Sequence, residues 1–175
     1  MTYDEYKNKI GTRYTFVQGE IVEDADGEVV VSNTPKLNTI YLNNRDRTAT
    51  LMVDPKLYVG RKWKLFTSDC VSVAAEYLDD HIGTSLKRVR PRREYDKYFK
   101  QGMCQWFEDH GFKEVAIADM QPNDVLVFDY DEGIITHVCV YLGDGKVLHH
   151  MSNKYSSIDP LGDVDSVLGV YRYAD

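Results

Sequence analysis

The run THVCVYLGDGKVLHH, which begins at Thr136, constrains the fold of this chain more than any other segment. Apolar residues alternate with others on both sides of Gly143-Asp144-Gly145, which predicts two strands, 136–142 and 146–151, joined by a tight turn. Such a hairpin needs neighbours in order to be stable, and two further β-prone runs, 125–129 and 167–173, can supply them. The later part of the chain therefore contains an antiparallel sheet.

Helical patterns lie between Pro55 and this sheet. One apolar stripe begins directly after Thr67-Ser68-Asp69, three residue types that cap helix N-termini, and predicts a helix over about 70–83. A second stripe predicts a helix over about 93–110, with Gly111 as its C-cap. Helices followed by an antiparallel sheet make the predicted fold class α+β.

The chain before Pro55 has a different pattern, with short β-prone runs separated by residues that favour turns. These runs, preceded by a short amphipathic helix over 2–10, are 14–22, 28–32, 37–42 and 48–53. They predict a small antiparallel β unit. We therefore divide the chain into a β-rich extension, 1–57, and a second unit, 58–175.

Composition excludes several classes of protein. Of the 175 residues 43% are hydrophobic, as in a globular protein, and a net charge of −7 has the wrong sign for a nucleic-acid-binding protein. No run approaches the roughly 20 apolar residues of a membrane helix, and the first residues lack the apolar stretch of a signal peptide. We expect a product made in the cytoplasm, with no membrane span and no nucleic-acid partner.

Three cysteines are an odd number, so at least one thiol is free. Cys70 falls at the first turn of a predicted helix, where unpaired N–H groups favour the thiolate and lower the thiol pKa. A nucleophilic cysteine needs a base and a third group that orients the base. The hairpin supplies His137 on one strand and His149 and His150 on the other.

The register of the hairpin decides which histidine joins His137. If Gly143-Asp144-Gly145 is a three-residue loop, Leu142 pairs with Lys146 and His149 shares the face of His137. If the turn contains only two residues, His150 takes that face, because a slip of one residue inverts every side chain. The residues alone leave both registers open.

Three segments in this order, WKLFTSDCVSVAAEYL, QPNDVLVFDY and THVCVYLGDGKVLHH, resemble the NlpC-type cell-wall cysteine peptidase family, and most closely its branch in phage tails and tail-like particles. The resemblance covers about 58–173. It implies a papain-like α+β core, with N-terminal helices packed on an antiparallel sheet. It also implies Cys70 as nucleophile, His137 as base and His149 as the orienting residue, which favours the three-residue loop.

The sequence departs from the family at several positions. Trp63 stands where the family has Tyr, and Phe66-Thr67 replace glycines; Trp63 either bounds the substrate pocket or belongs to the core. Asp69 is an N-cap or a substrate contact, and His150 is structural or lines the rim of the site. We carry Asp69, Trp63 and His150 forward as candidate substrate-binding residues. Asn123 replaces a turn glycine and tolerates the same left-handed backbone.

The other two cysteines are predicted to be packing residues. Cys139 lies in the sheet, and we expect it to pack under the helix that begins at Cys70. Cys104 belongs to the second predicted helix, and with His110 it lacks two further ligands at zinc-finger spacing. We expect no metal and no cofactor.

The family resemblance implies hydrolysis of amide bonds in the stem peptides of peptidoglycan, with D-glutamyl-diaminopimelate as the expected bond. It implies a virion tail component, assembled in the host cytoplasm and acting on the host cell wall. The segment 1–57 either shapes the cleft or docks onto a baseplate or hub protein, and we favour docking. Two alternatives remain: a structural tail-tip, hub or assembly protein whose site is vestigial or acts on virion proteins, and a papain-like amidase or acyltransferase of other biology.

Overall fold

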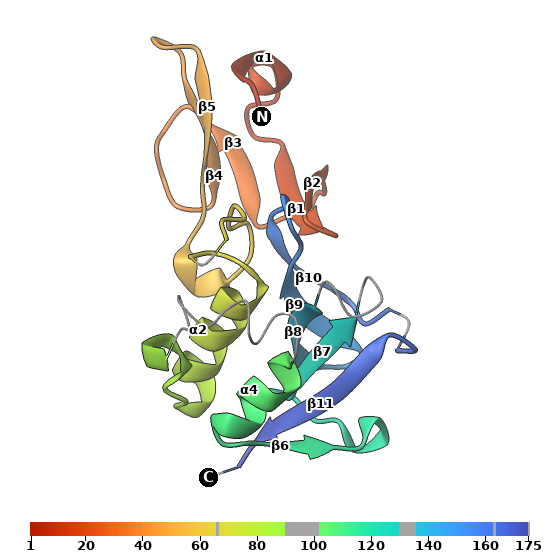
Figure 1. The fold of residues 1–175 in the computed structure, drawn as a ribbon. Helices are drawn as coiled ribbons and strands as arrows, with labels where there is room; N and C mark the ends of the chain where they lie inside the picture. The colour runs from red at the N-terminus through yellow and green to blue at the C-terminus, as the bar shows by residue number, and fades with distance from the viewer. Residues whose placement is uncertain (66, 90–101, 130–135, 163, 175) are drawn as a thin grey trace.

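The computed structural model describes residues 1–65, 67–89, 102–129, 136–162 and 164–174. They form two sheets (Figure 1). The first has the order β2-β1-β3-β4-β5 and the second the order β10-β9-β8-β7-β11-β6. The strands of the first sheet are β1 (Arg13–Val17), β2 (Glu20–Glu23), β3 (Val29–Ser32), β4 (Thr39–Asn43) and β5 (Thr48–Met52). The strands of the second are β6 (Phe112–Val115), β7 (Val125–Asp129), β8 (Thr136–Gly143), β9 (Lys146–His150), β10 (Ser156–Pro160) and β11 (Val167–Tyr173).

Helices are few and short in the described parts of the chain. The α-helices are α1 (Tyr3–Tyr6), α2 (Cys70–Ile82) and α4 (Met103–Asp109), and the 3₁₀ helices are η1 (Pro55–Leu57), η2 (Leu86–Val89) and η3 (Ile117–Asp119). The fold fits the predicted α+β class but is richer in strands than the sequence indicated. None of the helices described is long and apolar enough to cross a membrane.

The N-terminal sheet differs from its prediction in two ways. The run 14–22 is a hairpin, β1–β2, whose turn places Gln18 at φ 48° and Gly19 at φ 71°. The strands β3 and β4 are parallel, so the expected all-antiparallel unit is wrong. The six-residue connection 33–38 between them is shorter than the usual crossover of about a dozen residues, and the strands pair over only three residues each. The predicted helix over 2–10 shortens to α1, and Ile10 lies exposed.

The six-stranded sheet is antiparallel throughout, as predicted. The bounds of β7 and β11 match the predicted runs, whereas β6 and β10 were not predicted. The second predicted helix is wrong at Gly102, because its φ of 154° cannot occur within a helix. Thus α4 begins after Gly102 and has His110 as its C-cap, while 93–101 lies outside the described residues.

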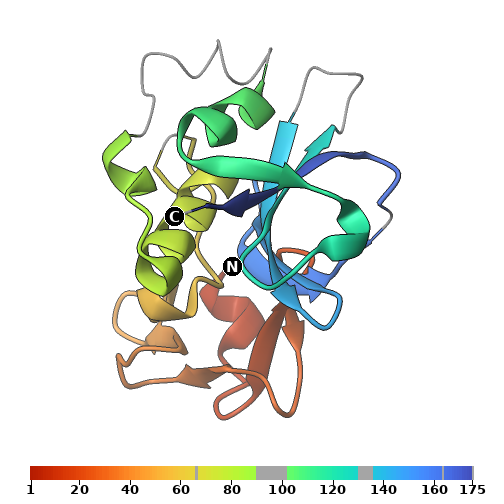
Figure 2. The ribbon, with the colours of Figure 1, turned by 90° about the horizontal axis from the view of Figure 1, so that it is seen from below.

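The helix α2 has the predicted bounds. Asp69 is its N-cap, and the left-handed Gly83, at φ 74°, is its C-cap. The buried face of α2 shares a core cluster with α4 and the sheet, and Figure 2 shows both helices on one side of the strands. That cluster includes Val71, Ala74, Ala75 and Leu78 of α2, Trp106 and Phe107 of α4, Val125 and Val127 of β7, and Val138 and Val140 of β8.

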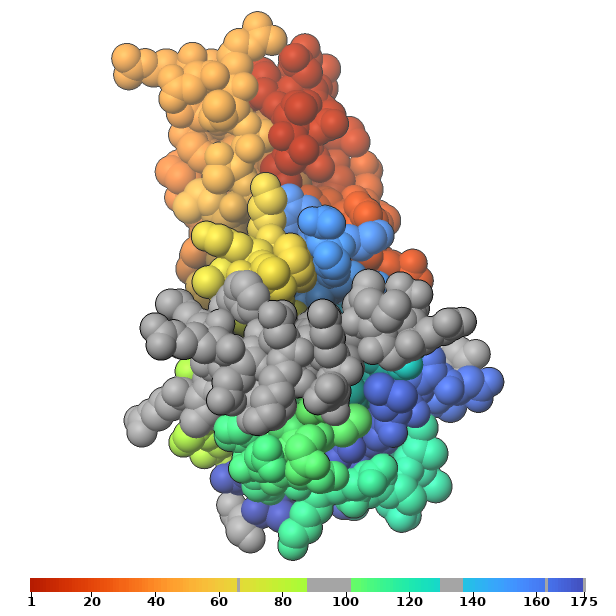
Figure 3. All heavy atoms as spheres, viewed as in Figure 1, coloured from red at the N-terminus to blue at the C-terminus, as the bar shows by residue number. Residues whose placement is uncertain are grey.

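A second core cluster joins the two sheets. It combines Tyr14, Phe16, Val29, Val31, Ile40 and Leu42 of the N-terminal sheet with Val73 of α2 and Leu148 of β9. Figure 3 shows the N-terminal sheet stacked on the rest of the molecule, with the segments near residues 60 and 155 at the junction. An isolated bridge pairs Lys62 with Tyr155 there. The N-terminal sheet is therefore held by a continuous apolar core.

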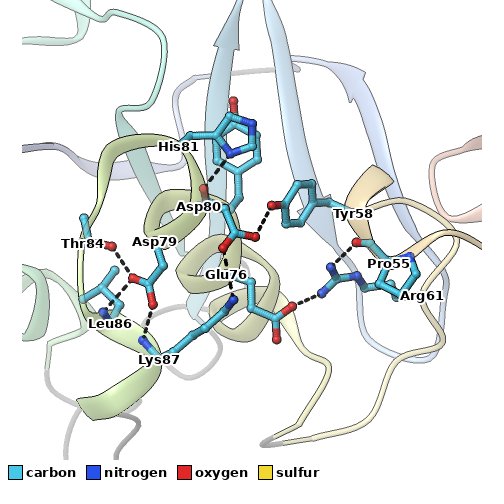
Figure 4. Close-up of polar contacts among 11 residues, drawn as sticks. Pro55, Tyr58, Arg61, Glu76, Asp79, Asp80, His81, Thr84, Leu86 and Lys87 are labelled. Carbon is cyan, nitrogen blue, oxygen red and sulfur yellow. Dashed lines mark hydrogen bonds and ion pairs between the residues drawn. The ribbon is translucent and has the colours of Figure 1, made fainter.

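Polar contacts fasten the connecting segment to α2 (Figure 4). The Arg61 guanidinium forms an ion pair with Glu76 and donates a 2.6 Å hydrogen bond to the Pro55 carbonyl. The Tyr58 hydroxyl donates a 2.5 Å hydrogen bond to Asp80. These contacts fix the angle at which the chain leaves the N-terminal sheet and enters α2.

Candidate active site

Cys70 is the first residue of α2, and its thiol lies against β8. The Asp69 carboxylate accepts a 2.8 Å hydrogen bond from the Ser72 N–H, which fixes the first turn of the helix. Cys70 is only 8% exposed, and its thiol interacts with the backbone N–H of Val138. The start of α2 therefore contacts β8 at Val138, the residue next to His137.

The electrostatic setting of Cys70 differs from the sequence-based expectation. Burial, followed by the neighbouring Asp69 carboxylate, raises the thiol pKa to about 12, although backbone N–H groups at the helix start act in the opposite direction. The predicted lowering of this pKa is wrong, because desolvation of the thiolate outweighs the helix dipole. Cys70 is a neutral thiol at pH 7, and it becomes a nucleophile only if a base takes its proton.

His137 can accept that proton. Its side chain is 6% exposed, and burial, followed by the repulsion of His149 and His150, lowers its pKa to about 3. At pH 7 the imidazole is neutral, so one ring nitrogen has a lone pair. The resting site therefore pairs a neutral thiol with a neutral imidazole.

His149 contacts His137, as expected from the family resemblance. The distance from His137 Nε2 to His149 Nδ1 is 3.3 Å, and the rings meet edge to face with centroids 5.5 Å apart. His149 is thus the histidine that contacts His137, whereas the expected three-residue loop is wrong. Asp144 and Gly145 form a two-residue turn with φ values of 51° and 69°, and Gly143 pairs with Lys146.

A β-bulge reconciles this turn with the position of His149. The pairing shifts between Tyr141 and Gly143, so that Cys139 lies opposite His149. One extra residue in β8 reverses the inversion that a two-residue turn alone would cause. The bulge therefore sets which histidine faces His137.

Behind His149 lies Asp159, a buried carboxylate that the sequence reasoning missed. The distance from Asp159 Oδ2 to His149 Nε2 is 2.7 Å, and Asp159 is 5% exposed. The segment 156–160, SSIDP, has no apolar alternation and ends in proline, so it gave no strand signal. Had a strand been expected there, the two-residue spacing of Ser157 and Asp159 would have placed both polar side chains on one face.

The three candidate substrate-binding residues have different settings. Asp69 serves as the N-cap and is 2% exposed. His150 is 1% exposed on the face opposite His149, and its Nε2 lies 3.2 Å from the Lys154 carbonyl. Trp63 is partly exposed and donates its backbone N–H to the same carbonyl. Only Trp63 retains surface that a substrate could contact.

Cys139 does not pack under the buried face of α2, as expected, but its thiol lies near enough to Cys70, at the start of α2, to interact with it. Its neighbours in the core are Leu126, Phe128, Val147 and Val170. Alternation along β8 explains the difference, because Val138 and Val140 take the face toward the helix. Cys104 is partly buried at the edge of the core.

Asn123, at φ 76°, has the left-handed backbone predicted from its place in the turn. Phe66 lies outside the described residues. In the ranges that the structure covers, no three His, Cys, Asp or Glu side chains are arranged to hold a metal ion.

Comparison with known proteins supports the resemblance seen in the motifs. The chain is 25% identical over 100 residues to the tail tip assembly protein K of Escherichia phage lambda, a match that covers 55% of this chain and 48% of that protein. The match thus spans about half of the length of that relative.

Among solved structures, an NlpC/P60 family protein from Bacillus cereus aligns with a TM-score of 0.44 and 22% identity, over 61% of this chain and 32% of that one. A protein of the same family from Staphylococcus aureus, described as similar to lipoprotein, aligns with a TM-score of 0.41 and 24% identity, over 68% and 38%. The model of the NlpC/P60 family itself matches residues 56–166, which include Cys70, His137, His149 and Asp159. The chain belongs to the NlpC/P60 family.

Proposed function

We propose that this protein is a cysteine endopeptidase that hydrolyses amide bonds in the stem peptides of peptidoglycan. The observation that carries the proposal is that the Cys70 thiol, at the start of α2, interacts with the N–H of Val138, the residue after His137, while His137 itself contacts His149. A thiol, a neutral imidazole and a group that orients the imidazole are what nucleophilic acyl transfer requires. Membership of the NlpC/P60 family supports the same chemistry.

In the proposed mechanism His137 removes the thiol proton as the Cys70 sulfur attacks the amide carbonyl. The tetrahedral intermediate collapses to a thioester, and His137 gives the proton to the departing amine. Water then attacks the thioester, with His137 again as the base, and frees Cys70. Backbone N–H groups at the start of α2, including that of Cys70, would stabilise the oxyanion. No step needs a metal.

The substrate bond is a finer proposal. We propose cleavage between D-glutamate and diaminopimelate, which rests on the family resemblance. Trp63 is the candidate for a contact with the stem peptide, because it is the one of the three predicted substrate-binding residues with exposed surface.

We also propose that the protein works as part of a phage tail. The relative in phage lambda is named as a tail tip assembly protein, which supports assembly in the host cell and action at the next cell wall. The segment 1–57 would then help to fasten the enzyme to a baseplate or hub protein. The core shared by both sheets means that this segment also supports the peptidase unit, 58–175.

An assembly role without cell-wall hydrolysis is the second candidate. The printed name of the lambda relative favours it, and so does the deep burial of a Cys70 thiol whose pKa is raised to about 12. In that case the site would be vestigial or would cut virion proteins.

Digestion of purified peptidoglycan, with mass spectrometry of the products, tests the proposal. We expect the wild-type protein to release fragments cut within the stem peptide, and Cys70→Ala to release none while keeping the fold. Cleavage by Cys70→Ala, or no cleavage by a folded wild-type protein that does cut a virion protein, would overturn it.

A further inference from the structure

The Asp159 carboxylate accepts hydrogen bonds from two separate parts of the chain. Its Oδ2 lies 2.7 Å from His149 Nε2 and accepts a 2.5 Å hydrogen bond from the Ser157 hydroxyl. Its Oδ1 accepts a 2.8 Å hydrogen bond from the backbone N–H of Gln18, which is 141 residues away in the sequence. The Gly19 N–H in turn donates to Ser157 Oγ at 3.0 Å.

The Gln18-Gly19 turn between β1 and β2 contacts this carboxylate through its backbone. Both residues have positive φ, which turns two successive N–H groups toward β10. The Gly19 carbonyl accepts a 3.0 Å hydrogen bond from the Tyr155 N–H, so the turn is held on both sides. The N-terminal sheet thus touches the candidate active site through its backbone.

Hydrogen-bond roles fix the position of each proton along this chain of groups. Burial raises the pKa of Asp159, but hydrogen bonds from Ser157, Gln18 and His149 together outweigh it and hold the pKa below its usual value. An ionised carboxylate only accepts, so His149 Nε2 must have the proton and donate it. In a neutral His149 the lone pair is then on Nδ1, which accepts the hydrogen bond from His137 Nε2.

This order leaves one tautomer for His137. With the proton on Nε2, a neutral imidazole has its lone pair on Nδ1, the only other ring nitrogen. That is the nitrogen available to take the thiol proton of Cys70 in the proposed mechanism. The carboxylate therefore sets the tautomer of the base through an intervening histidine.

We propose that Asp159 is a positioning residue of the active site, and that the β1–β2 turn of the N-terminal sheet completes the site by holding Asp159 through the Gln18 N–H. Its meaning for catalysis rests on the proposed peptidase function, whereas its structural content does not. In this arrangement the segment 1–57 is a part of the site and not a detachable docking element.

The substitution Asp159→Asn gives a sharp test because it keeps the shape of the side chain. The Gln18 N–H cannot be removed, so the amide turns its oxygen toward Gln18 and its NH₂ toward His149. His149 must then accept at Nε2 and have its proton on Nδ1, which also forces His137 to accept at Nε2. The proton of His137 moves to Nδ1, so the base loses the lone pair that would take the thiol proton of Cys70.

The experiment is long-range ¹H–¹⁵N correlation spectroscopy of the imidazole nitrogens in the full chain at neutral pH. We expect protons on Nε2 of both His137 and His149 in the wild type, and on Nδ1 of both in Asp159→Asn. The matched control is Asp144→Asn, the same chemical change at an exposed turn residue of the β8–β9 hairpin, which leaves both tautomers unchanged. Peptidoglycan cleavage by Asp159→Asn should fall about 10²–10⁴-fold.

A proton on Nδ1 of wild-type His149 would overturn the inference, and this measurement decides even if Asp159→Asn does not fold. Unchanged tautomers in a folded Asp159→Asn would overturn it as well. If the wild type has the expected tautomers but leaves peptidoglycan intact, the proposed substrate fails while the positioning role of Asp159 stands.

Discussion

The two sheets contribute to the candidate active site in different ways. The six-stranded sheet supplies the side chains of His137, His149 and Asp159. The N-terminal sheet supplies the backbone N–H groups of Gln18 and Gly19, which reach Asp159 and Ser157. A side-chain site leaves a residue pattern in the sequence, whereas a backbone contact does not. This difference explains why the sequence alone suggested that the N-terminal segment is a separate unit.

The sharpest comparison within the six-stranded sheet is between His149 and His150, which are adjacent on β9 but on opposite faces. We expect His149→Ala to lower the rate of peptidoglycan cleavage about 10²–10⁴-fold, because His137 loses the group that orients it. We expect His150→Ala to keep most activity per folded molecule but to lower the free energy of unfolding by about 1–3 kcal/mol, since it leaves a cavity in the core. Steady-state assays and urea denaturation of both variants check this, and the reverse pattern would show that His150, and not His149, orients His137.

The N-terminal contribution can be broken at Gly19. An alanine Cβ there would lie 2.6 Å from Lys154 Cβ and 2.7 Å from the Tyr155 carbonyl oxygen, at a φ that side chains rarely adopt. We expect Gly19→Ala to push the turn away from Asp159 and to lower cleavage by roughly 10-fold or more, by analogy with the loss of groups that orient a ligand. The control is Gly162→Ala, where a Cβ would meet nothing within 4 Å. Equal activity of the two variants would separate the N-terminal sheet from the site.

The pH dependence of stability distinguishes the buried site from the surface. The pKa of His137 is lowered to about 3 in the folded protein, so the unfolded chain binds its proton first as pH falls below about 6.5. The contribution of this group to stability is therefore fully present above pH 6.5 and is lost toward pH 3, by about 5 kcal/mol for a shift of this size. Denaturation curves between pH 7 and pH 4 should lose less stability in His137→Gln than in the wild type. Parallel pH profiles for the two proteins would contradict the burial of a neutral imidazole.

Ser157 should have the smallest effect. It donates to Asp159 and accepts from Gly19, but His149 and Gln18 keep their own hydrogen bonds to Asp159 without it. We expect Ser157→Ala to lower activity only several-fold, in keeping with about 1 kcal/mol for one hydrogen bond. Kinetic comparison with Asp159→Asn checks this ranking. A loss as large as that of Asp159→Asn would move the positioning role to the serine.

Much of the fold of residues 58–175 could be predicted because its signals are local. The N-cap Asp69 and the C-cap Gly83 define α2, and apolar runs define β7 and β11 with the right bounds. The contact of His137 with His149 could be expected only from the family resemblance, because the residues alone left the register of the hairpin open. A two-residue turn with a bulge places His149 on the same face as a three-residue loop would.

The rest depends on contacts between distant parts of the chain. Asp159 lies on a strand without a strand pattern, and its partner Gln18 acts through a backbone group that any residue has. The pKa of Cys70 depends on how deeply the helix start is buried, which the helix-capping pattern cannot reveal. The parallel pairing of β3 and β4 is likewise a tertiary choice.

The most direct test of the account is to trap the thioester. The wild-type protein is mixed with stem-peptide fragments of peptidoglycan, quenched with acid within the first turnover, and analysed by intact and peptide mass spectrometry. We predict an acyl group on Cys70, absent in Cys70→Ala and strongly reduced in Asp159→Asn. Formation of cleavage products by Cys70→Ala, or an acyl group on Cys104 or Cys139, would contradict the assignment of Cys70 as the nucleophile.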